Sequence, residues 1–450
     1  MSSILPTLPA PVAPTPPESH RFRLANGLEV HRVERHALPI VDLAVVLRAG
    51  AERDDGSQAG RARLTGELLL EGTHTRDGRE FAEAVELLGA VLDVQTGWDR
   101  TTVGLHVLAP RLGEALVLVH EALTQPRFAE AELARARRER LAALLQERSE
   151  PRSLASFHFA RALYGETHPY GQPLGGSSGS VANLEIGDVA GFHARNYGPG
   201  NAFVVAVGDV DETGLRRVLE DTLGRWTGSP AGDMPAPGGA AAPAAPIILV
   251  DRPGAPQTEL RIGQVAAARA TPDYFALLVL NAVLGGTFTS RINIRLREEK
   301  GYTYGAGSSF LFRRGPGPFV VSSAVQGGAA TVDAVQDVWR ELERIREEPV
   351  PEAELERARR YLKLGLAREF ETTNAVAEQI AEQVLYGLGE SYFGRYVAQV
   401  EAVDAAAVQT AARRWLDPAG RVTVAVGDRA ALEPGLGALG PVILASELAL

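Results

Sequence analysis

The sequence predicts an α+β fold made of two related halves, each a mixed, mostly antiparallel sheet with helices packed on it. The first observation is that two motifs recur. FVVAVGDVD (203–211) aligns with VTVAVGDRA (422–430) at an offset of 219 residues, and LLLEGTHT (68–75) aligns with AVLGGTFT (282–289) at 214. A repeat this long indicates two homologous domains rather than a solenoid. The second observation is that strand and helix patterns mix in an uneven order, which favours α+β over a doubly wound sheet.

The composition excludes several classes of protein. Of the 450 residues, 45% are hydrophobic and 23% are charged, which is typical of a globular chain. Lys and Arg (46) are fewer than Asp and Glu (56), which argues against nucleic-acid binding because phosphate contacts need a basic surface. The chain has no cysteine, so disulfides and thiolate metal sites are excluded. Because no apolar run reaches the ~18 residues that span a membrane and no signal peptide is evident, we expect a cytoplasmic protein.

Two segments of biased composition set the predicted domain boundaries. Residues 1–18 contain six prolines and no Lys or Arg, which predicts a disordered lead-in. WTGSPAGDMPAPGGAAAPAAP (226–246) is rich in Ala, Pro and Gly, which is typical of a linker. We therefore predict an N-terminal domain at 19–227, a linker at 228–245 and a C-terminal domain at 246–450.

In the first half, a turn signal at Asn26-Gly27 lies between alternating β-rich runs and predicts a hairpin entering a sheet. A helix is expected at about 59–70. The segment 129–148 is rich in Ala, Glu, Arg and Leu with leucines spaced along it, so it predicts a long amphipathic helix.

The second half repeats this order of elements. ILVDRP (248–253) and TELRIGQVAA (258–267) are predicted strands, followed by a predicted helix TPDYFALLVLNAVLG (271–285). PEAELERARRYLKLGLAREFE (351–371) predicts the second long helix.

Several segments together resemble one enzyme family. They are AGAERDDGSQAGRARLTGELLLEGT, HPYGQPLGG, NYGPGNAFVVAVGD and LGGTFTSRINIRLREEKGYTYGAGSSF, of which LREEKGYTYG is the most specific. The chain from about His20 to Asp428 is similar to the pitrilysin/insulinase-type zinc metallopeptidases, above all to short bacterial members and the subunits of the mitochondrial processing peptidase. The resemblance implies that the two metallopeptidase-like domains form half of a clamshell.

Active members of that family carry an H-x-x-E-H motif, in which two histidines one helical turn apart bind zinc and the glutamate activates water. Aligned on Gly72-Thr73, these positions are Arg63, Gly66 and Glu67 in this chain. The region expected to supply the third ligand is Leu-Ala-Ala-Leu at 141–144. These residue types cannot hold Zn²⁺, so we predict a degenerate zinc motif and no metal on this chain.

Arg63 and Glu67 are four residues apart, which predicts an ordinary ion pair on a helix. The alternative is that the pair fills the vacated metal pocket. No two histidines have the spacing of a metal site, and Asp54-Asp55 is expected to be a solvated turn. No G-x-G-x-x-G follows a clear strand and no P-loop is present.

In the resembling family, an Arg and a Tyr spaced like Arg297 and Tyr304 face the zinc site from the opposite half of the clamshell. The resemblance implies that Tyr304 donates to the developing oxyanion and that Arg297 contacts the substrate backbone, although a helix-end arginine and a buried tyrosine would also satisfy the pattern. The small residues before them, Gly285, Gly286 and Thr287 with Phe288, predict close approach of a peptide.

The pattern predicts the zinc-free subunit of a heterodimeric metallopeptidase. A zinc-bearing partner of the same family would supply the metal, and extended peptides would be the substrate, bound partly by strand addition at a sheet edge. A homodimer stays possible, and no nucleic acid or membrane partner is expected. The alternatives are a non-enzymatic peptide-binding or scaffold protein and a factor that presents one precursor peptide to another enzyme.

Overall fold

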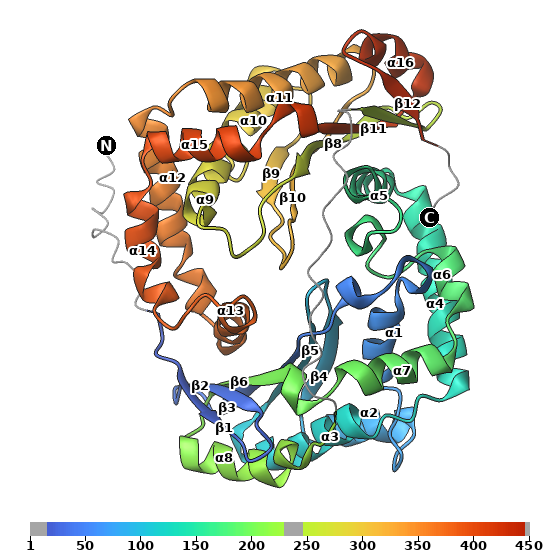
Figure 1. Ribbon diagram of the computed structural model, residues 1–450, viewed down its shortest axis with the longest axis vertical. Coiled ribbons are helices and arrows are strands. Elements are labelled where there is room, and N and C mark those ends of the chain that lie inside the picture. The colour runs from blue at the N-terminus through green and yellow to red at the C-terminus, as the bar shows by residue number, and fades with distance from the viewer. Residues whose placement is uncertain (1–15, 229–245, 446–450) are drawn as a thin grey trace, which may run out of the picture.

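The computed structural model of the protein describes residues 16–228, here the N-terminal half, and residues 246–445, here the C-terminal half. The predicted lead-in 1–18 lies outside the described residues except for 16–18, and the predicted linker 228–245 lies outside them except for 228. Each half contains one six-stranded sheet with helices on both faces (Figure 1).

The first sheet has the strand order β1-β2-β6-β3-β5-β4. The strands are β1 (His20–Arg23), β2 (Glu29–Glu34), β3 (Ile40–Leu47), β4 (Val91–Thr96), β5 (Thr101–Leu108) and β6 (Ala202–Gly208). Only β2 and β6 run parallel. The predicted entry hairpin is confirmed: β1 and β2 pair antiparallel around a turn in which Gly27 has a φ of +87°, a conformation that favours glycine.

The second sheet has the order β12-β7-β11-β8-β10-β9. Its strands are β7 (Ile247–Asp251), β8 (Gln257–Val265), β9 (Ala306–Phe310), β10 (Pro318–Gln326), β11 (Val422–Gly427) and β12 (Val442–Leu444). The strand order β7-β11-β8-β10-β9 in the second sheet corresponds to the order β2-β6-β3-β5-β4 in the first sheet. The sheets differ at the opposite edge, which is occupied by antiparallel β1 in the first sheet and by parallel β12 in the second. The predicted duplicated α+β fold is confirmed.

Sixteen α-helices connect the strands in the described residues. The N-terminal half contains α1 (Arg61–Leu68), α2 (Gly78–Leu87), α3 (Leu112–Thr124), α4 (Glu130–Ser149), α5 (Pro151–Tyr164), α6 (Ser178–Asn183), α7 (Ile186–Asn196) and α8 (Glu212–Asp221). The C-terminal half contains α9 (Tyr274–Leu284), α10 (Arg291–Asn293), α11 (Ala329–Glu347), α12 (Glu352–Gly365), α13 (Thr373–Leu385), α14 (Tyr392–Ala402), α15 (Ala405–Trp415) and α16 (Arg429–Gly437). No helix in the described ranges is both long enough and apolar enough to cross a membrane.

The predicted helices at 59–70, 129–148 and 271–285 are present as α1, α4 and α9. The prediction of one helix over 351–371 was too long, because α12 ends at Gly365 and a short 3₁₀ turn follows at Arg368–Phe370. Leu366 and Phe370, on either side of this turn, are buried against the first sheet.

Each half packs one of its helices against the sheet of the other half. Helix α13 of the C-terminal half packs on the inner face of the first sheet, with Val376 and Ile380 against Val46 and Val205. Helix α5 of the N-terminal half packs in the same way on the second sheet, where Phe159 belongs to one buried cluster with strands β7, β10 and β11. Figure 1 shows α13 beside β3 and β6, and α5 beside β8 and β11. Because each helix completes the core of the other half, burial of apolar surface joins the halves firmly.

Candidate functional site

Helix α1 carries Arg63, Gly66 and Glu67, the three residues that the resemblance aligns with the zinc motif. Arg63 and Glu67 form the predicted ion pair, with Nε of Arg63 2.7 Å from Oε1 of Glu67, and both side chains are 40% exposed. The position between them, Gly66, is buried and faces the edge strand β4. A Cβ at Gly66 would lie 2.6 Å from Oγ1 of Thr96 and 3.1 Å from Cγ1 of Val94. Any side chain at position 66 would therefore press against the side chains of Thr96 and Val94 on β4.

The contact between α1 and α4 is apolar. Leu64 and Leu68 of α1 belong to one buried cluster with Leu133 and Leu144 of α4. Leu144 is the buried member of the 141–144 segment, the region where the resemblance implies a third ligand. The described residues contain no group of three or more His, Asp or Glu that could hold a metal ion. The side chains at this position do not fit zinc.

The N-terminal end of α1 is held by Asp54, a residue that the sequence analysis placed incorrectly in a solvated turn. Asp54 is only 4% exposed, and its carboxylate accepts hydrogen bonds from the backbone N–H groups of Gly60 (3.1 Å) and Ala62 (3.1 Å). Burial raises the pKa of Asp54 to about 7, although the guanidinium of Arg61 opposes this shift. Asp55, in contrast, is exposed as predicted and caps the next short turn.

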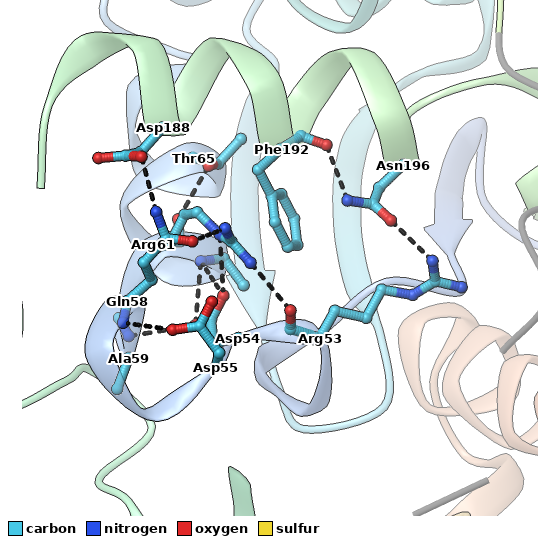
Figure 2. Close-up of polar contacts among 12 residues, drawn as sticks. Arg53, Asp54, Asp55, Gln58, Ala59, Arg61, Thr65, Asp188, Phe192 and Asn196 are labelled. Atoms are coloured by element: carbon cyan, nitrogen blue, oxygen red, sulfur yellow. Dashed lines mark hydrogen bonds and ion pairs between the residues drawn. The ribbon is translucent and has the colours of Figure 1, made fainter. Parts of the chain in front are cut away.

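Arg61 connects α1 to α7 behind this carboxylate (Figure 2). Its guanidinium donates to the carbonyl of Arg53 over 2.9 Å and lies 5.1 Å from the centre of the Phe192 ring on α7. Gln58 accepts from Arg61 and donates to Asp188 on α7 over 2.7 Å. These contacts orient α1 without any metal ligand. Sequence reasoning missed these contacts because the spacing of the partner residues in the sequence matches no helix-capping motif.

Arg297 and Tyr304 lie on the connection between α10 and β9. Arg297 is in a π-helical turn (Ile294–Glu299), and its guanidinium carbon lies 4.4 Å from the centre of the Phe288 ring. Tyr304 is 93% exposed, and among the described residues no hydrogen bond joins its hydroxyl to another group. Tyr304 is therefore not the buried tyrosine that the alternative interpretation requires.

The backbone around Tyr304 is fixed although its side chain is free. The Oγ1 of Thr303 accepts from the N–H of Gly305 over 3.1 Å and lies 2.7 Å from the carbonyl of Ala324 on β10. On α10, the side chain of Asn293 bridges the carbonyl of Phe288 (2.7 Å) and the N–H of Ala306 (3.0 Å). The segment thus presents an exposed phenol from a hydrogen-bonded turn.

The residues predicted to approach a peptide, Gly285 to Phe288, end helix α9. A Cβ at Gly285 would lie 2.4 Å from Oγ of Ser308, and a Cβ at Gly286 would lie 2.5 Å from Nδ2 of Asn281. Packing within the chain therefore explains both glycines. The hydroxyl of Thr287 donates to the carbonyl of Ala282 (3.1 Å), and Phe288 is 66% exposed. Peptide contact at these residues stays a prediction.

Comparisons with known proteins agree with this fold. Residues 31–175 match the family model "Insulinase (Peptidase family M16)", and residues 183–362 match "Peptidase M16 inactive domain". A relative from Mycobacterium tuberculosis, described as an uncharacterized zinc protease, is 27% identical over 400 residues, which is 88% of this chain and 90% of the relative. A Helicobacter pylori protein described as a non-peptidase homolog is 29% identical over 187 residues, 41% of this chain and 43% of its own.

A solved structure extends this likeness to the whole fold. The crystal structure of a peptidase M16 inactive domain from Pseudomonas fluorescens has a TM-score of 0.85 and 27% sequence identity, and the match covers 91% of this chain and 98% of that one. The two family models, both of peptidase family M16, together match most of the chain. The chain therefore belongs to peptidase family M16, the insulinase family.

Proposed function

We propose that this protein is the zinc-free subunit of a two-chain metallopeptidase that cleaves peptides. A partner of the same family with an intact H-x-x-E-H helix would hold the zinc, and this chain would contribute Arg297 and Tyr304 to the partner's site. Support comes from the retained position of α1 and from its residues Arg63, Gly66 and Glu67, which do not suit a metal. By this proposal the chain alone is an inactive peptidase homologue.

The observation that carries the proposal is the exposure of Tyr304. A large aromatic side chain that is 93% exposed on a hydrogen-bonded turn buries little apolar surface, so fold stability does not require it. A phenol exposed in this way can donate a hydrogen bond to a carbonyl outside the chain. One such donor aimed at a developing oxyanion is typically worth ~2.7–4 kcal/mol of transition-state stabilisation.

Peptide binding has a second basis in the edge strands. β4 ends the first sheet and β9 ends the second, so each has one side without a further strand among the described residues. An extended peptide that adds to such an edge gains main-chain hydrogen bonds and places alternate side chains on the inner face of the sheet. Helix α1 packs beside β4, the strand nearest to the degenerate motif.

The proposal is tested by removing one oxygen atom. Tyr304→Phe should lower peptide cleavage by the assembled pair about 10²-fold while leaving co-purification of the two chains unchanged. The matched control is Tyr361→Phe on α12, which removes a hydroxyl from a half-exposed tyrosine. Equal turnover of the Tyr304→Phe pair and the wild-type pair would show that Tyr304 has no catalytic role.

A second candidate is a non-enzymatic peptide-binding or scaffold protein. The Helicobacter pylori relative described as a non-peptidase homolog favours it. This candidate predicts that no partner makes the complex proteolytic and that the neighbouring reading frames encode no chain with H-x-x-E-H. Peptide binding by the chain with no cleavage in the presence of any zinc-bearing relative would establish it.

A further inference from the structure

A pocket of about 740 Å³ opens near the edge of the first sheet that is opposite to β4. Glu29 and His31 of β2 line one side of it, and the C-terminal part of α13, the beginning of α14 and the loop between these helices line another. Sites for small molecules typically enclose about 300–1,000 Å³. Neither α1 nor Arg297 and Tyr304 line this pocket, so it is separate from the residues considered above.

The pocket contains an arginine that no carboxylate pairs with. Arg48 follows β3, and its guanidinium carbon lies 4.7 Å from the centre of the Phe203 ring on β6. No ion pair or hydrogen bond joins this guanidinium to another group among the described residues. Burial lowers the pKa of Arg48, and the negative charge of Glu29 opposes the shift although the two side chains form no ion pair. The N–H donors of Arg48 are therefore held over an aromatic ring and available to an anion.

The other charged groups of the pocket are paired or exposed. Glu29 pairs with Arg23 over 2.8 Å, and Arg21 pairs with Glu390 over 3.1 Å. Glu18 is exposed to solvent. One unneutralised cation among acids favours a singly charged anion such as a carboxylate, because the neighbouring carboxylates would repel a phosphate dianion more strongly.

Two further polar groups suit a ligand that carries an N–H donor next to its carboxylate. The Oγ of Ser19 lines the pocket and is buried with no hydrogen-bond partner among the described residues, so this hydroxyl can donate to a carboxylate. The carboxylate of Glu29 has lone pairs beyond those that Arg23 and His31 use, so it can accept from an N–H group. An amino acid presents both functions on one α-carbon.

Apolar side chains form the wall on the helical side. Ile380 and Val384 of α13 and Phe393 of α14 line the pocket and belong to the apolar layer that covers the first sheet. The wall is held in place by Gln383, which is 8% exposed and whose Nε2 donates to the carbonyl of Gly389 over 2.6 Å. An apolar side chain of a ligand would bury its surface against this wall.

We propose that this pocket binds the α-carboxylate of an apolar amino acid, either free or as the last residue of a peptide. The carboxylate accepts from Arg48 and Ser19 in charge-assisted hydrogen bonds, and the α-nitrogen donates to Glu29. Free amino acids and chain ends share these groups, since an ammonium and a peptide N–H are both donors. Binding needs neither zinc nor a partner chain, so the inference goes beyond the proposed function.

The experiment measures binding to the full chain by isothermal titration calorimetry. Leucine is compared with leucinamide, and N-acetyl-tetraalanyl-leucine is compared with its C-terminal carboxamide, so that each pair tests the carboxylate. At least one acid should bind 10-fold or more tightly than its amide. Arg48→Gln should reduce this preference below 3-fold. The matched control is Arg79→Gln on α2, an exposed arginine that does not line the pocket.

A second variant fills the pocket. Gly394 on α14 lines it, and a Cβ there would have no neighbour within 4 Å, so Gly394→Leu places a side chain in open space. This variant should weaken binding of the acid at least 10-fold. Gly365→Leu on α12 is the control, because a Cβ there also meets no neighbour within 4 Å and Gly365 does not line the pocket.

Binding of leucine alone would identify a free amino acid as the ligand, and binding of the peptide alone would identify a chain end; either result supports the inference. If each acid binds no better than its amide, or if nothing binds, the inference is overturned while the proposed peptidase function stands. A preference for the acid that survives both Arg48→Gln and Gly394→Leu would place the site elsewhere and overturn it too. The wild-type comparison stays decisive even if Arg48→Gln fails to fold.

Discussion

The hydroxyl of Tyr386 donates to Oδ2 of Asp99 over 2.8 Å, and this bond joins the C-terminal half to the N-terminal half. Asp99 is buried and also accepts from the backbone N–H of Arg314 (2.7 Å) and the hydroxyl of Tyr170 (3.2 Å). One carboxylate thus collects donors from three segments distant in sequence. Its charge is satisfied only when the two halves are assembled.

Removal of the Tyr386 hydroxyl should therefore destabilise the assembled chain. Tyr386→Phe keeps the ring but takes one donor from a buried carboxylate, which should cost about 1.5–3 kcal/mol because hydrogen bonds to charged groups are the stronger ones. The change is measured as a lower thermal unfolding midpoint, with Tyr361→Phe as the control. An unchanged midpoint for Tyr386→Phe would mean that Asp99 is satisfied without it.

The neighbouring Glu52 makes stability depend on pH. Burial raises the pKa of Glu52 from 4.5 to about 7, opposed by its hydrogen bond from Arg314 and aided by Asp99. The folded state thus binds the Glu52 proton more tightly than the unfolded state does. The contribution of Glu52 to stability is fully present below about pH 4.5 and is lost as the pH rises through about 7.

Glu52→Gln should remove this part of the pH dependence. Between pH 5 and 8 the thermal unfolding midpoint of the variant should fall less steeply with pH than that of the wild type. The two slopes should differ by at most ~1.4 kcal/mol of unfolding free energy per pH unit. Differential scanning fluorimetry over that range measures both curves. Parallel curves would contradict the assignment to Glu52.

Gly66→Ala should destabilise the protein although alanine is the better helix former. The added Cβ meets the edge strand at 2.6 Å, and overpacking of this kind costs about 1–3 kcal/mol. Gly394→Ala in α14 is the matched control, because a Cβ there has no neighbour within 4 Å. It should stabilise by about 0.5–1 kcal/mol. If both variants shift the unfolding midpoint upward, the close contact at Gly66 is unimportant.

Restoring the histidines of the motif should not restore zinc binding. The triple variant Arg63→His, Gly66→Glu, Glu67→His still faces Leu144 where a third ligand is needed, and its residue 66 collides with Thr96. We expect less than a tenth of an equivalent of zinc after dialysis, measured by mass spectrometry, against none for the wild type. One tightly bound equivalent would show that α4 supplies a ligand after all.

Much of the fold could be predicted from the sequence, since local signals determine it. The turn at Asn26-Gly27 and the helix that became α1 depend on residues close in the chain, and the near-constant offset between two pairs of short motifs indicates the duplication. The exchange of α5 and α13 between the sheets could not be predicted. Periodicity shows that a helix has an apolar face but not which sheet the face covers.

The candidate site was predictable only in part for the same reason. The ion pair of Arg63 and Glu67 follows from their spacing on one helix, and the structure contains it. The burial of Asp54 depends on backbone donors six and eight residues away and on an arginine held by α7. A pocket between the first sheet and α13, beside β4, combines residues of β3, β4, β5 and α13, which meet only after the halves assemble.

The measurement that tests the central claim most directly compares the purified chain with the same chain bound to a zinc-bearing relative from its own genome. Zinc content and cleavage of an extended peptide are determined for both. The account predicts no bound zinc and no cleavage for the chain alone, and one zinc per pair with chelator-sensitive cleavage for the complex. Stoichiometric zinc or chelator-sensitive cleavage by the isolated chain would contradict it.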